Sequence, residues 1–464
     1  MQAPKKLDIY LMGIGGTGMG AFAGLLKELG HNVRGSDMSV YSPMKEKLSE
    51  WGINYKTPYD AKNLSGSPDL VIVGNVIRKD NVEVLEMLKR DIPYDSFPCA
   101  LKKFFLRDST PIVITGTHGK TTSSALIAHT LISAGRSPGF LIGGALKNYP
   151  ESFRLGAKDH PFVVEGDEYD TAFFDKGPKF MHYQPKFLLA TSLEYDHADI
   201  YPHVDDIVLA FAKLFSSMKE DSLIVINASK KNLEKARILS KTMAKILTYG
   251  DDGNFTAKDL ILDSTGIKFS VHLDDKPLGQ VCLPLFGEHN VENALGCYAL
   301  LYTFGLKHED IFVGFKSFLG VARRMEEVFN DEKIIAIDDF AHHPTAVRET
   351  IKACRQKYPM REIWAIFEPR SATACKKIFE DDFSKALDIA DRIFLTPLGR
   401  KLDKKEELDT YAIAKAINKT HVKAKAYDAY EDLISDLQES DTRRVHLFMS
   451  NGDFMGHKLR LWQK

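Results

Sequence analysis

The sequence lacks the features that mark secreted, membrane-spanning or nucleic-acid-binding proteins. Its five cysteines are scattered, odd in number and without a CxxC pair, which argues against a disulfide framework or a structural zinc site and favours a reducing compartment. No apolar run is long enough to span a bilayer, and glycines interrupt the first apolar stretch, so we expect neither an anchor nor a signal peptide. Lys plus Arg (62) balance Asp plus Glu (63), which leaves no basic excess for nucleic acid. We expect a cytoplasmic protein with no nucleic-acid or membrane partner.

The length and the alternation of short apolar runs with helical stretches indicate several α/β domains. A chain of 464 residues is too long for one ordinary core and suggests about three domains. We predict a Rossmann-like domain over 1–107, a P-loop ATPase-like domain over 108–320 and a second Rossmann-like domain over 321–464.

The most informative stretch is a glycine loop near residue 116. An apolar run, 112–114, leads into Gly116-Thr-His-Gly-Lys120-Thr121-Thr and then an amphipathic segment. Strand, glycine loop and helix build a phosphate cradle, in which Lys120 adds charge and the Thr121 hydroxyl can hold Mg²⁺. The spacing departs from GxxxxGK[ST], because Ile114 stands at the first glycine position, and a plain Gly-rich turn is the alternative. The context favours binding of a nucleoside triphosphate.

A second glycine loop lies near the start of the chain. The strand-like run 7–12 is followed by GIGGTGMG and a helical segment, which satisfies GxGxxG in a βαβ context, and Asp37 is close to the usual ribose acid. NAD would fit this motif. However, a P-loop follows in the same chain, and no later residues resemble the catalytic His-Asp or Tyr-Lys set of a dehydrogenase. The diphosphate of a UDP-sugar fits the same junction. Asp37 has the alternative role of a turn or cap residue, and Asn75, after the run 70–73, is a candidate lip of the same cleft.

Carboxylates and amides follow apolar runs in the middle third. Glu165 comes directly off the run 161–164, where it can hold Mg²⁺, although its acidic neighbours can also be caps. His197 lies between acids after a third apolar run, which favours metal ligation over a capping role. Asn290 and Asn293 share a face at a helix start and can pair with an adenine edge, with an N-cap as the alternative for one of them.

The last third predicts another parallel α/β unit. The expected strands are 333–337, 362–367, 392–395, 422–426 and 445–449. Arg370, in a loop after one of them, can clamp a carboxylate bidentately or form a surface ion pair. His342 and His343 lack partners at metal-ligand spacing, so we interpret them as nucleotide or hinge contacts.

Blocks along the whole chain resemble the Mur ligases, ATP-dependent enzymes that build and recycle peptidoglycan precursors. The matching blocks are GIGGTGMG, GSD, TGTHGKTT, EGDEYD, EYDHADIY, FGEHNVENA, GVARRME, DDFAHHPTA, FEPRS and MSNGDF. One departure is Ala372, where the resemblance leads us to expect Asn, and it puts one acceptor contact in doubt.

The resemblance implies roles for residues in all three domains. The UDP-sugar site would contain Gly15, Gly16, Thr17, Gly18, Met19, Ser36, Asp37, Asn75 and His118. The ATP site would contain Gly116, Thr117, His118, Gly119, Lys120, Thr121, Thr122, Asn290, Asn293, Arg324 and either Asp338 or Asp339 at the ribose. Mg²⁺ would be held by Thr121, Glu165 and His197, and the acceptor by Arg370, Ser371 and Asn451. Lys120, Glu165, His197 and Arg324 would be the catalytic set.

Within the family, blocks such as GSDMSVYSPM and EGDEYDTAFFDK resemble the member that uses a recycled peptide. The resemblance implies that UDP-N-acetylmuramate is joined to the tripeptide L-Ala-γ-D-Glu-meso-diaminopimelate, with ATP as co-substrate and Mg²⁺ as cofactor. The alternative is ligation of free L-alanine to the same sugar nucleotide. We expect a monomer or weak homodimer. An oxidoreductase, a non-catalytic nucleotide-binding regulator and a folate polyglutamylating ligase fit the motifs less well.

Overall fold

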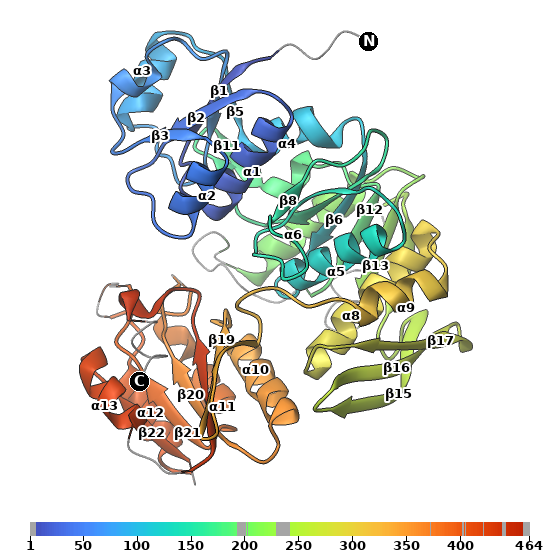
Figure 1. Cartoon of the computed structure of the whole chain (residues 1–464), viewed down its shortest axis with the longest axis vertical. Helices are drawn as coiled ribbons and strands as arrows, with labels where there is room; N and C mark the ends of the chain where they lie inside the picture. The colour runs from blue at the N-terminus through green and yellow to red at the C-terminus, as the bar shows by residue number, and fades with distance from the viewer. Residues whose placement is uncertain are drawn as a thin grey trace.

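Three large sheets, one after another along the chain, dominate the described part of the protein, and a separate two-stranded sheet accompanies the central one (Figure 1). The structure, a computed structural model, describes residues 6–192, 201, 203–228, 242–371, 373–400, 403, 405–420, 422–438 and 442–457. In the view of Figure 1 the N-terminal sheet lies at the top, the central sheet in the middle and the C-terminal sheet at the lower left. This architecture confirms the predicted fold class of three α/β domains with parallel sheets.

The N-terminal domain is a parallel sheet in the order β3-β2-β1-β4-β5. Its elements are β1 (Asp8–Met12), α1 (Thr17–Glu28), β2 (Asn32–Ser36), α2 (Met44–Glu50), β3 (Asn54–Lys56), η1 (Ala61–Leu64), β4 (Leu70–Val73), α3 (Val82–Lys89), β5 (Tyr94–Ser96), α4 (Phe97–Leu101) and η2 (Lys102–Leu106). Ile9 and Leu11 pack in the core that contains α1, whereas Tyr10 and Met12 pack on the α3 side. This alternation covers both faces of the sheet. Because β2 and β4 flank β1 on opposite sides, the first glycine loop leaves the sheet at a topological switch point.

The central domain repeats this arrangement around β6. Its elements are β6 (Thr110–Thr115), α5 (Lys120–Ser133), β7 (Gly139–Leu141), β8 (Phe153–Arg154), β9 (Pro161–Gly166), β10 (Asp170–Ala172), β11 (Asp175–Pro178), η3 (Lys179–His182), β12 (Phe187–Ala190), α6 (Val204–Ser216), β13 (Leu223–Asn227), β14 (Lys245–Tyr249), β15 (Phe255–Asp263), β16 (Gly266–Leu273), β17 (Lys276–Leu283), α8 (Glu288–Phe304) and α9 (His308–Lys316). Parallel partners β12 and β9 flank β6, so the second glycine loop also opens at a switch point. The antiparallel strands β15, β16 and β17, which extend this sheet, were not predicted.

The C-terminal domain has the strand order β18-β19-β23-β20-β21-β22. Its elements are β18 (Glu326–Asn330), β19 (Ile334–Asp339), α10 (Pro344–Lys357), β20 (Glu362–Phe367), η5 (Lys377–Phe379), α11 (Glu380–Leu387), β21 (Arg392–Leu395), α12 (Thr410–Ile417), β22 (Lys423–Ala426), α13 (Tyr430–Gln438), β23 (Arg444–Met449) and η6 (Phe454–Gly456). The strands β20 and β21 have the predicted bounds. The expectation of a purely parallel unit was wrong at one edge, because β18 runs antiparallel to β19. Both faces of β18 are partly exposed, and this half-exposed edge lacks the continuous apolar run that identified the other strands.

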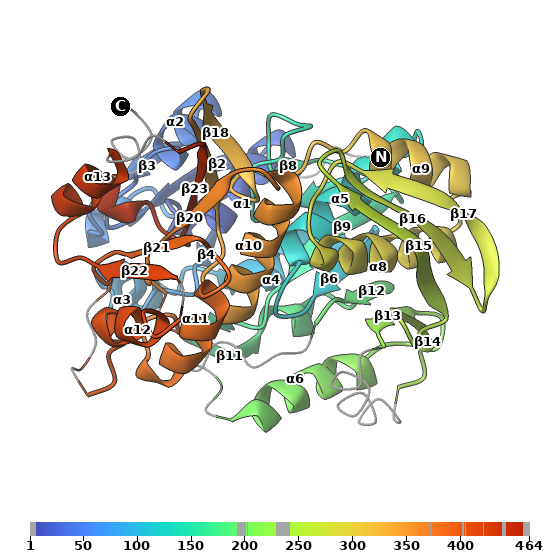
Figure 2. The same ribbon diagram turned by 90° about the horizontal axis from the view of Figure 1, so that it is seen from below.

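The central and C-terminal domains contact each other through α10, which packs against α8 and β15 (Figure 2). Gln356 of α10 accepts a hydrogen bond from the Gly287 amide at 2.7 Å and donates to the carbonyl groups of Asp263 and Gly266 at 3.2 and 3.3 Å. These contacts hold the C-terminal domain beside the start of α8. Among the described residues, no helix is long and apolar enough to cross a membrane.

Candidate active site

The loop between β6 and α5 presents an open helix N-terminus. Gly116 and Gly119 have φ values of 127° and 82°, where glycine is favoured over other residues. A Cβ on Gly119 would lie 2.3 Å from Asn293 Oδ1, and one on Gly116 would lie 2.4 Å from Thr191 Oγ1. Gly119, the N-cap of α5, has no side chain with which to cap the first turn, so the amides of this turn can meet an anion in the loop, as a phosphate cradle requires.

Lys120, the first residue of α5, is held by two groups of the loop region. Its Nζ donates to the Gly116 carbonyl at 2.7 Å and forms an ion pair with Glu168 Oε2 at 3.1 Å. Burial alone would lower the pKa of Lys120, but the carboxylates of Glu168 and Asp167 outweigh it and raise the pKa above its ordinary value. The ammonium therefore stays protonated, ready to meet phosphate. Glu168 belongs to the acidic run after β9 but was not predicted as a partner of Lys120.

Two side chains with oxygen donors, both predicted as metal ligands, lie side by side next to Lys120. The Thr121 hydroxyl donates to Glu165 Oε2 at 3.1 Å, and the Gly143 amide donates to Glu165 Oε1 at 2.7 Å. Burial, followed by the charge of Asp167, raises the pKa of Glu165, so this carboxylate gains from a cation beside it. A hydroxyl and a carboxylate are the hard oxygen donors that suit Mg²⁺. His197, the third predicted ligand, lies outside the described residues.

A cavity of about 690 Å³ extends from this loop to the C-terminal domain. Predicted ATP-site residues that line it are Thr117, His118, Gly119, Lys120, Thr121, Thr122, Asn290, Asn293, Arg324 and Asp339. The rings of His118 and His343 lie 5.0 Å apart between centroids across the domain boundary. A volume of this size is within the range of small-molecule sites.

The two predicted adenine-reading amides contact each other. Asn293 Nδ2 donates to Asn290 Oδ1 at 3.2 Å, and Asn290 Nδ2 donates to the Phe286 carbonyl at 2.8 Å. These bonds fix both side chains at the start of α8. Their contact with adenine stays a prediction.

The segment from Arg323 to Met325, which leads into the C-terminal domain, has an unusual backbone. Arg323 and Met325 have φ values of 57° and 49°, a conformation that non-glycine residues rarely adopt. Asp339 Oδ2 accepts from the Met325 amide at 2.7 Å, whereas Asp338 pairs with Arg323 Nε at 3.3 Å. Of the two aspartates proposed for the ribose, Asp339 lines the cavity. Arg324 packs over the Phe340 ring at 5.1 Å.

The N-terminal glycine loop is exposed at Gly16, Thr17 and Gly18, where α1 begins without a side-chain cap. Asp37 accepts hydrogen bonds from the amides of Gly15 at 2.8 Å and Met38 at 2.7 Å. Its carboxylate therefore holds the loop in shape. This is the role of a turn residue, which the sequence offered as the alternative to a ribose contact.

The other predicted UDP-sugar residues of this domain differ in how exposed their side chains are. Ser36 is buried and donates to Glu83 Oε2 at 2.5 Å, so its hydroxyl is occupied within the domain. Asn75, by contrast, is exposed after β4. Met19 lies at the first turn of α1 and is largely buried.

The predicted acceptor residues gather at the loops after β20 and β23. Arg370 Nη1 forms an ion pair with Asp453 Oδ1 at 2.7 Å, and the Ser371 hydroxyl accepts from the Ala374 amide at 2.9 Å. Asn451 Oδ1 is buried, and the described residues give it no hydrogen-bond partner. Ala372, the departure from the family pattern, lies outside the described residues. Asp453 was not predicted, although it stands in the same SNGD block as Asn451.

Comparison with known proteins agrees with this arrangement. Residues 8–108 match the family description "Mur ligase family, catalytic domain", residues 114–301 "Mur ligase middle domain" and residues 323–452 "Mur ligase, glutamate ligase domain". The chain is 39% identical over 390 residues, 84% of each chain, to the UDP-N-acetylmuramate–L-alanyl-γ-D-glutamyl-meso-2,6-diaminoheptandioate ligase of Escherichia coli (strain K12).

Two solved structures are similar over nearly the whole chain. A murein peptide ligase from Psychrobacter arcticus is 31% identical with a TM-score of 0.74, and the comparison covers 98% of each chain. A UDP-N-acetylmuramate-alanine ligase from Thermotoga maritima is 26% identical with a TM-score of 0.81, also over 98% of each chain.

Proposed function

The chain belongs to the Mur ligase family, and on this basis we propose that it joins UDP-N-acetylmuramate to the tripeptide L-Ala-γ-D-Glu-meso-diaminopimelate at the expense of ATP. The E. coli relative, whose name contains this peptide, is 39% identical. The reaction would reuse peptide released from the cell wall.

The observation that carries the proposal is the grouping of Lys120, Thr121 and Glu165 at the open start of α5. A protonated amine, the first turn of α5 and a hydroxyl–carboxylate pair line one cavity of about 690 Å³. This grouping suits a polyphosphate that must approach a second anion, because the positive groups reduce the repulsion between them.

In the first step, an oxygen of the muramate carboxylate attacks the γ-phosphorus of ATP. The bond from that phosphorus to the β,γ-bridging oxygen breaks, ADP leaves, and an acyl phosphate forms. Lys120 would neutralise charge on the transferred group, and the α5 amides would orient it. In the second step, the L-Ala amine attacks the acyl carbon, inorganic phosphate leaves from the tetrahedral intermediate, and the amine loses a proton.

Thr121 and Glu165, with His197, would hold Mg²⁺. When bound, the ion would supply further positive charge for the phosphate oxygens. The oxygen donors at Thr121 and Glu165 fit this cation. Because Glu165 is held by the Gly143 amide, the carboxylate stays in position without the ion.

The other two domains would supply the remaining substrates. The exposed loop at the start of α1, which includes Gly18, would receive the diphosphate of the UDP-sugar. Arg370, Ser371 and Asn451 would receive the tripeptide, whose carboxylates suit an arginine at the end of β20. Since these groups lie on separate domains, domain closure would complete the site.

Phosphate release from the pure protein tests the proposal. With UDP-N-acetylmuramate, ATP and Mg²⁺, we expect faster turnover with the tripeptide than with free L-alanine. Equal or faster turnover with L-alanine would assign the chain to the alanine-adding branch, which the T. maritima structure keeps as the second candidate. Lys120→Ala should abolish phosphate release and leave UDP-sugar binding nearly unchanged, whereas surviving release would contradict the phosphate role of the α5 loop.

A further inference from the structure

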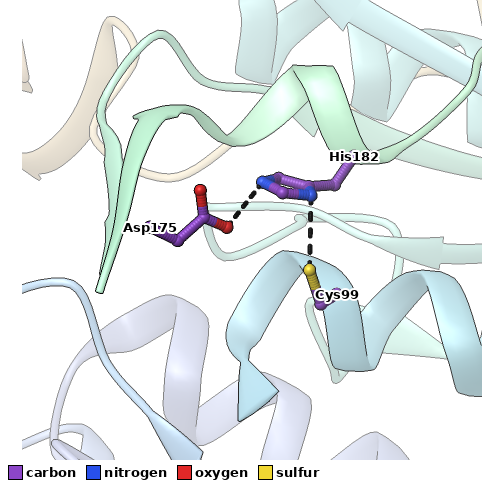
Figure 3. Close-up of side chains that lie close together, drawn as sticks. All are labelled: Cys99, Asp175 and His182. Atoms are coloured by element: carbon purple, nitrogen blue, oxygen red, sulfur yellow. Dashed lines mark hydrogen bonds and ion pairs between the residues drawn. The ribbon is translucent and has the colours of Figure 1, made fainter. Parts of the chain in front are cut away.

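Three side chains far apart in the sequence lie together where the N-terminal and central domains meet (Figure 3). Cys99 comes from α4, Asp175 from the start of β11 and His182 from the end of η3. Cys99 Sγ is 3.2 Å from His182 Nδ1, and His182 Nε2 is 2.9 Å from Asp175 Oδ2. One potential ligand atom from each residue lies within 4.8 Å of the others. The cluster is separate from the ATP-facing cavity, whose lining includes none of the three.

The backbone that carries this cluster is firmly packed. Phe180 and Tyr183, on either side of His182, are 0% and 1% exposed. Across the domain boundary, the rings of Tyr94 and Phe174 meet edge to face at 5.0 Å. The Tyr94–Phe174 contact joins β5 to the β10–β11 hairpin, and α4 packs against β10 and η3, so the three side chains are positioned before any ligand arrives.

We propose that Cys99, His182 and Asp175 form a binding site for a divalent transition-metal ion of the zinc class. A thiolate and an imidazole are ligands that Zn²⁺ prefers, whereas Mg²⁺ selects oxygen ligands and would not compete for this site. An ion beside His182 Nδ1 meets the Cys99 sulfur directly. Asp175 holds the other ring nitrogen, which favours the tautomer with Nδ1 free to ligate.

Asp175 can also become the third ligand. One of its carboxylate oxygens lies within 4.8 Å of the ligand atoms that Cys99 and His182 offer, so an ion among the three side chains is within reach of Asp175. Three protein ligands leave one position of a tetrahedral ion for water. The partial exposure of His182, 24%, gives the ion a path from solvent.

The hydrogen-bonded series Cys99, His182 and Asp175 also resembles the arrangement that activates a nucleophilic cysteine. The charges around Cys99 argue against such a role. Burial raises the pKa of the Cys99 thiol, and the negative charges of Asp95 and Asp175 add to this effect. Reactive thiols lie in electropositive surroundings instead. The same carboxylates favour a bound cation, because their negative charges attract it. On binding, the S–H bond is replaced by a sulfur–metal bond, and the proton passes to solvent.

Cobalt binding to the full chain tests the site directly. After treatment with a chelator and dialysis, Co²⁺ titration of the wild type should produce the near-ultraviolet thiolate-to-cobalt charge-transfer band, with saturation at one equivalent. Cys99→Ser should abolish the band, and His182→Gln should weaken binding by about tenfold or more. Asp175→Asn should weaken it less. Cys282→Ser is the matched control, since Cys282 is also a partly exposed free cysteine, and it should retain the band.

Alkylation of the wild type provides a second measurement that needs no variant to fold. Zn²⁺ should slow the alkylation of Cys99 relative to Cys282, as followed by peptide mass spectrometry. The proposal is overturned if the wild type gives no band, if the band persists in Cys99→Ser, or if Zn²⁺ leaves the alkylation of Cys99 unchanged. Because phosphate release is not measured in either experiment, failure here would leave the proposed ligase activity intact.

Discussion

Glu168 is fully buried and forms a 3.1 Å ion pair with Lys120, the cation at the start of α5. Without nucleotide, this carboxylate is the counter-charge of the ammonium. ATP would bring a second anion to the same Nζ, so the ion pair links the stability of the empty protein to its affinity for ATP.

Glu168→Gln should destabilise the protein without ATP by about 3 kcal/mol, because it removes one partner of a buried ion pair. Urea denaturation at neutral pH measures this loss. The stabilisation by ATP should be larger in the variant than in the wild type, since phosphate then supplies the missing counter-charge. Asp170→Asn is the control, because Asp170 and Lys176 form an exposed pair in the same region, and its effect should stay below about 1 kcal/mol. Equal losses for the two variants would contradict the role of Glu168.

Gly119→Ala and Gly135→Ala should differ sharply although both glycines have positive φ, 82° and 72°. A Cβ at Gly119 meets Asn293 Oδ1 at 2.3 Å, whereas a Cβ at Gly135 meets nothing within 4 Å. Both changes should reduce stability by about 1–2 kcal/mol through backbone strain. Only Gly119→Ala should also weaken ATP binding, by at least about tenfold, because it distorts the loop that holds phosphate. Calorimetric titration with ATP in the presence of Mg²⁺ distinguishes them, and equal ATP affinities would count against the assigned loop.

His289 should make the nucleotide-free protein sensitive to acid. Burial lowers the pKa of His289 from 6.5 to about 4; the charge of Glu349 opposes this shift, and the positive charge of Arg324 adds to it. Because the folded pKa lies below the unfolded one, the unfolded chain binds the proton first. The contribution of neutral His289 to the free energy of unfolding is therefore complete above pH 6.5 and is lost as the pH falls toward 4. His289→Gln should show a shallower loss of unfolding free energy over this range, compared with the wild type by denaturation at several pH values. An unchanged slope would show that His289 does not titrate in this way.

Arg370→Ala should raise KM for the tripeptide more than about tenfold and leave KM for ATP nearly unchanged, because it removes a charge-assisted contact to the acceptor. Arg370→Lys should recover little, since lysine cannot form the bidentate contact. Asp453→Asn keeps the arginine but removes its 2.7 Å partner, so we expect a smaller change. Steady-state phosphate release with varied tripeptide checks all three. A similar rise in KM for the tripeptide and in KM for ATP would indicate that Arg370 supports the folded structure in general and does not contact the acceptor.

Local patterns in the sequence were sufficient for the fold class and for the two glycine loops. A buried strand, a glycine turn and an amphipathic helix are consecutive in the chain, so their residues identify them directly. The strand bounds of β20 and β21 followed from apolar runs between polar residues. The antiparallel strands β15 to β18 were missed, because partly exposed strands with mixed polarity carry little periodic signal.

Contacts between separate elements required the tertiary structure. Ser36 and Asp37 are adjacent in the chain, yet Ser36 is bonded to buried Glu83 and Asp37 to the amide of Gly15. Ser36 ends β2 and Asp37 follows the strand, and a position at the end of a strand does not by itself say which partners a side chain will meet.

By itself, the sequence determined that this chain has three α/β units, a glycine loop before Lys120 that predicts phosphate binding, and blocks that resemble the Mur ligases. Only the tertiary structure decided that Glu168 neutralises Lys120 and that Cys99 meets His182 across 83 residues. The scattered cysteines had argued against zinc, because a CxxC pair shows its spacing within one segment. A site assembled from two domains has no such spacing, since the packing of one domain on another brings its ligands together.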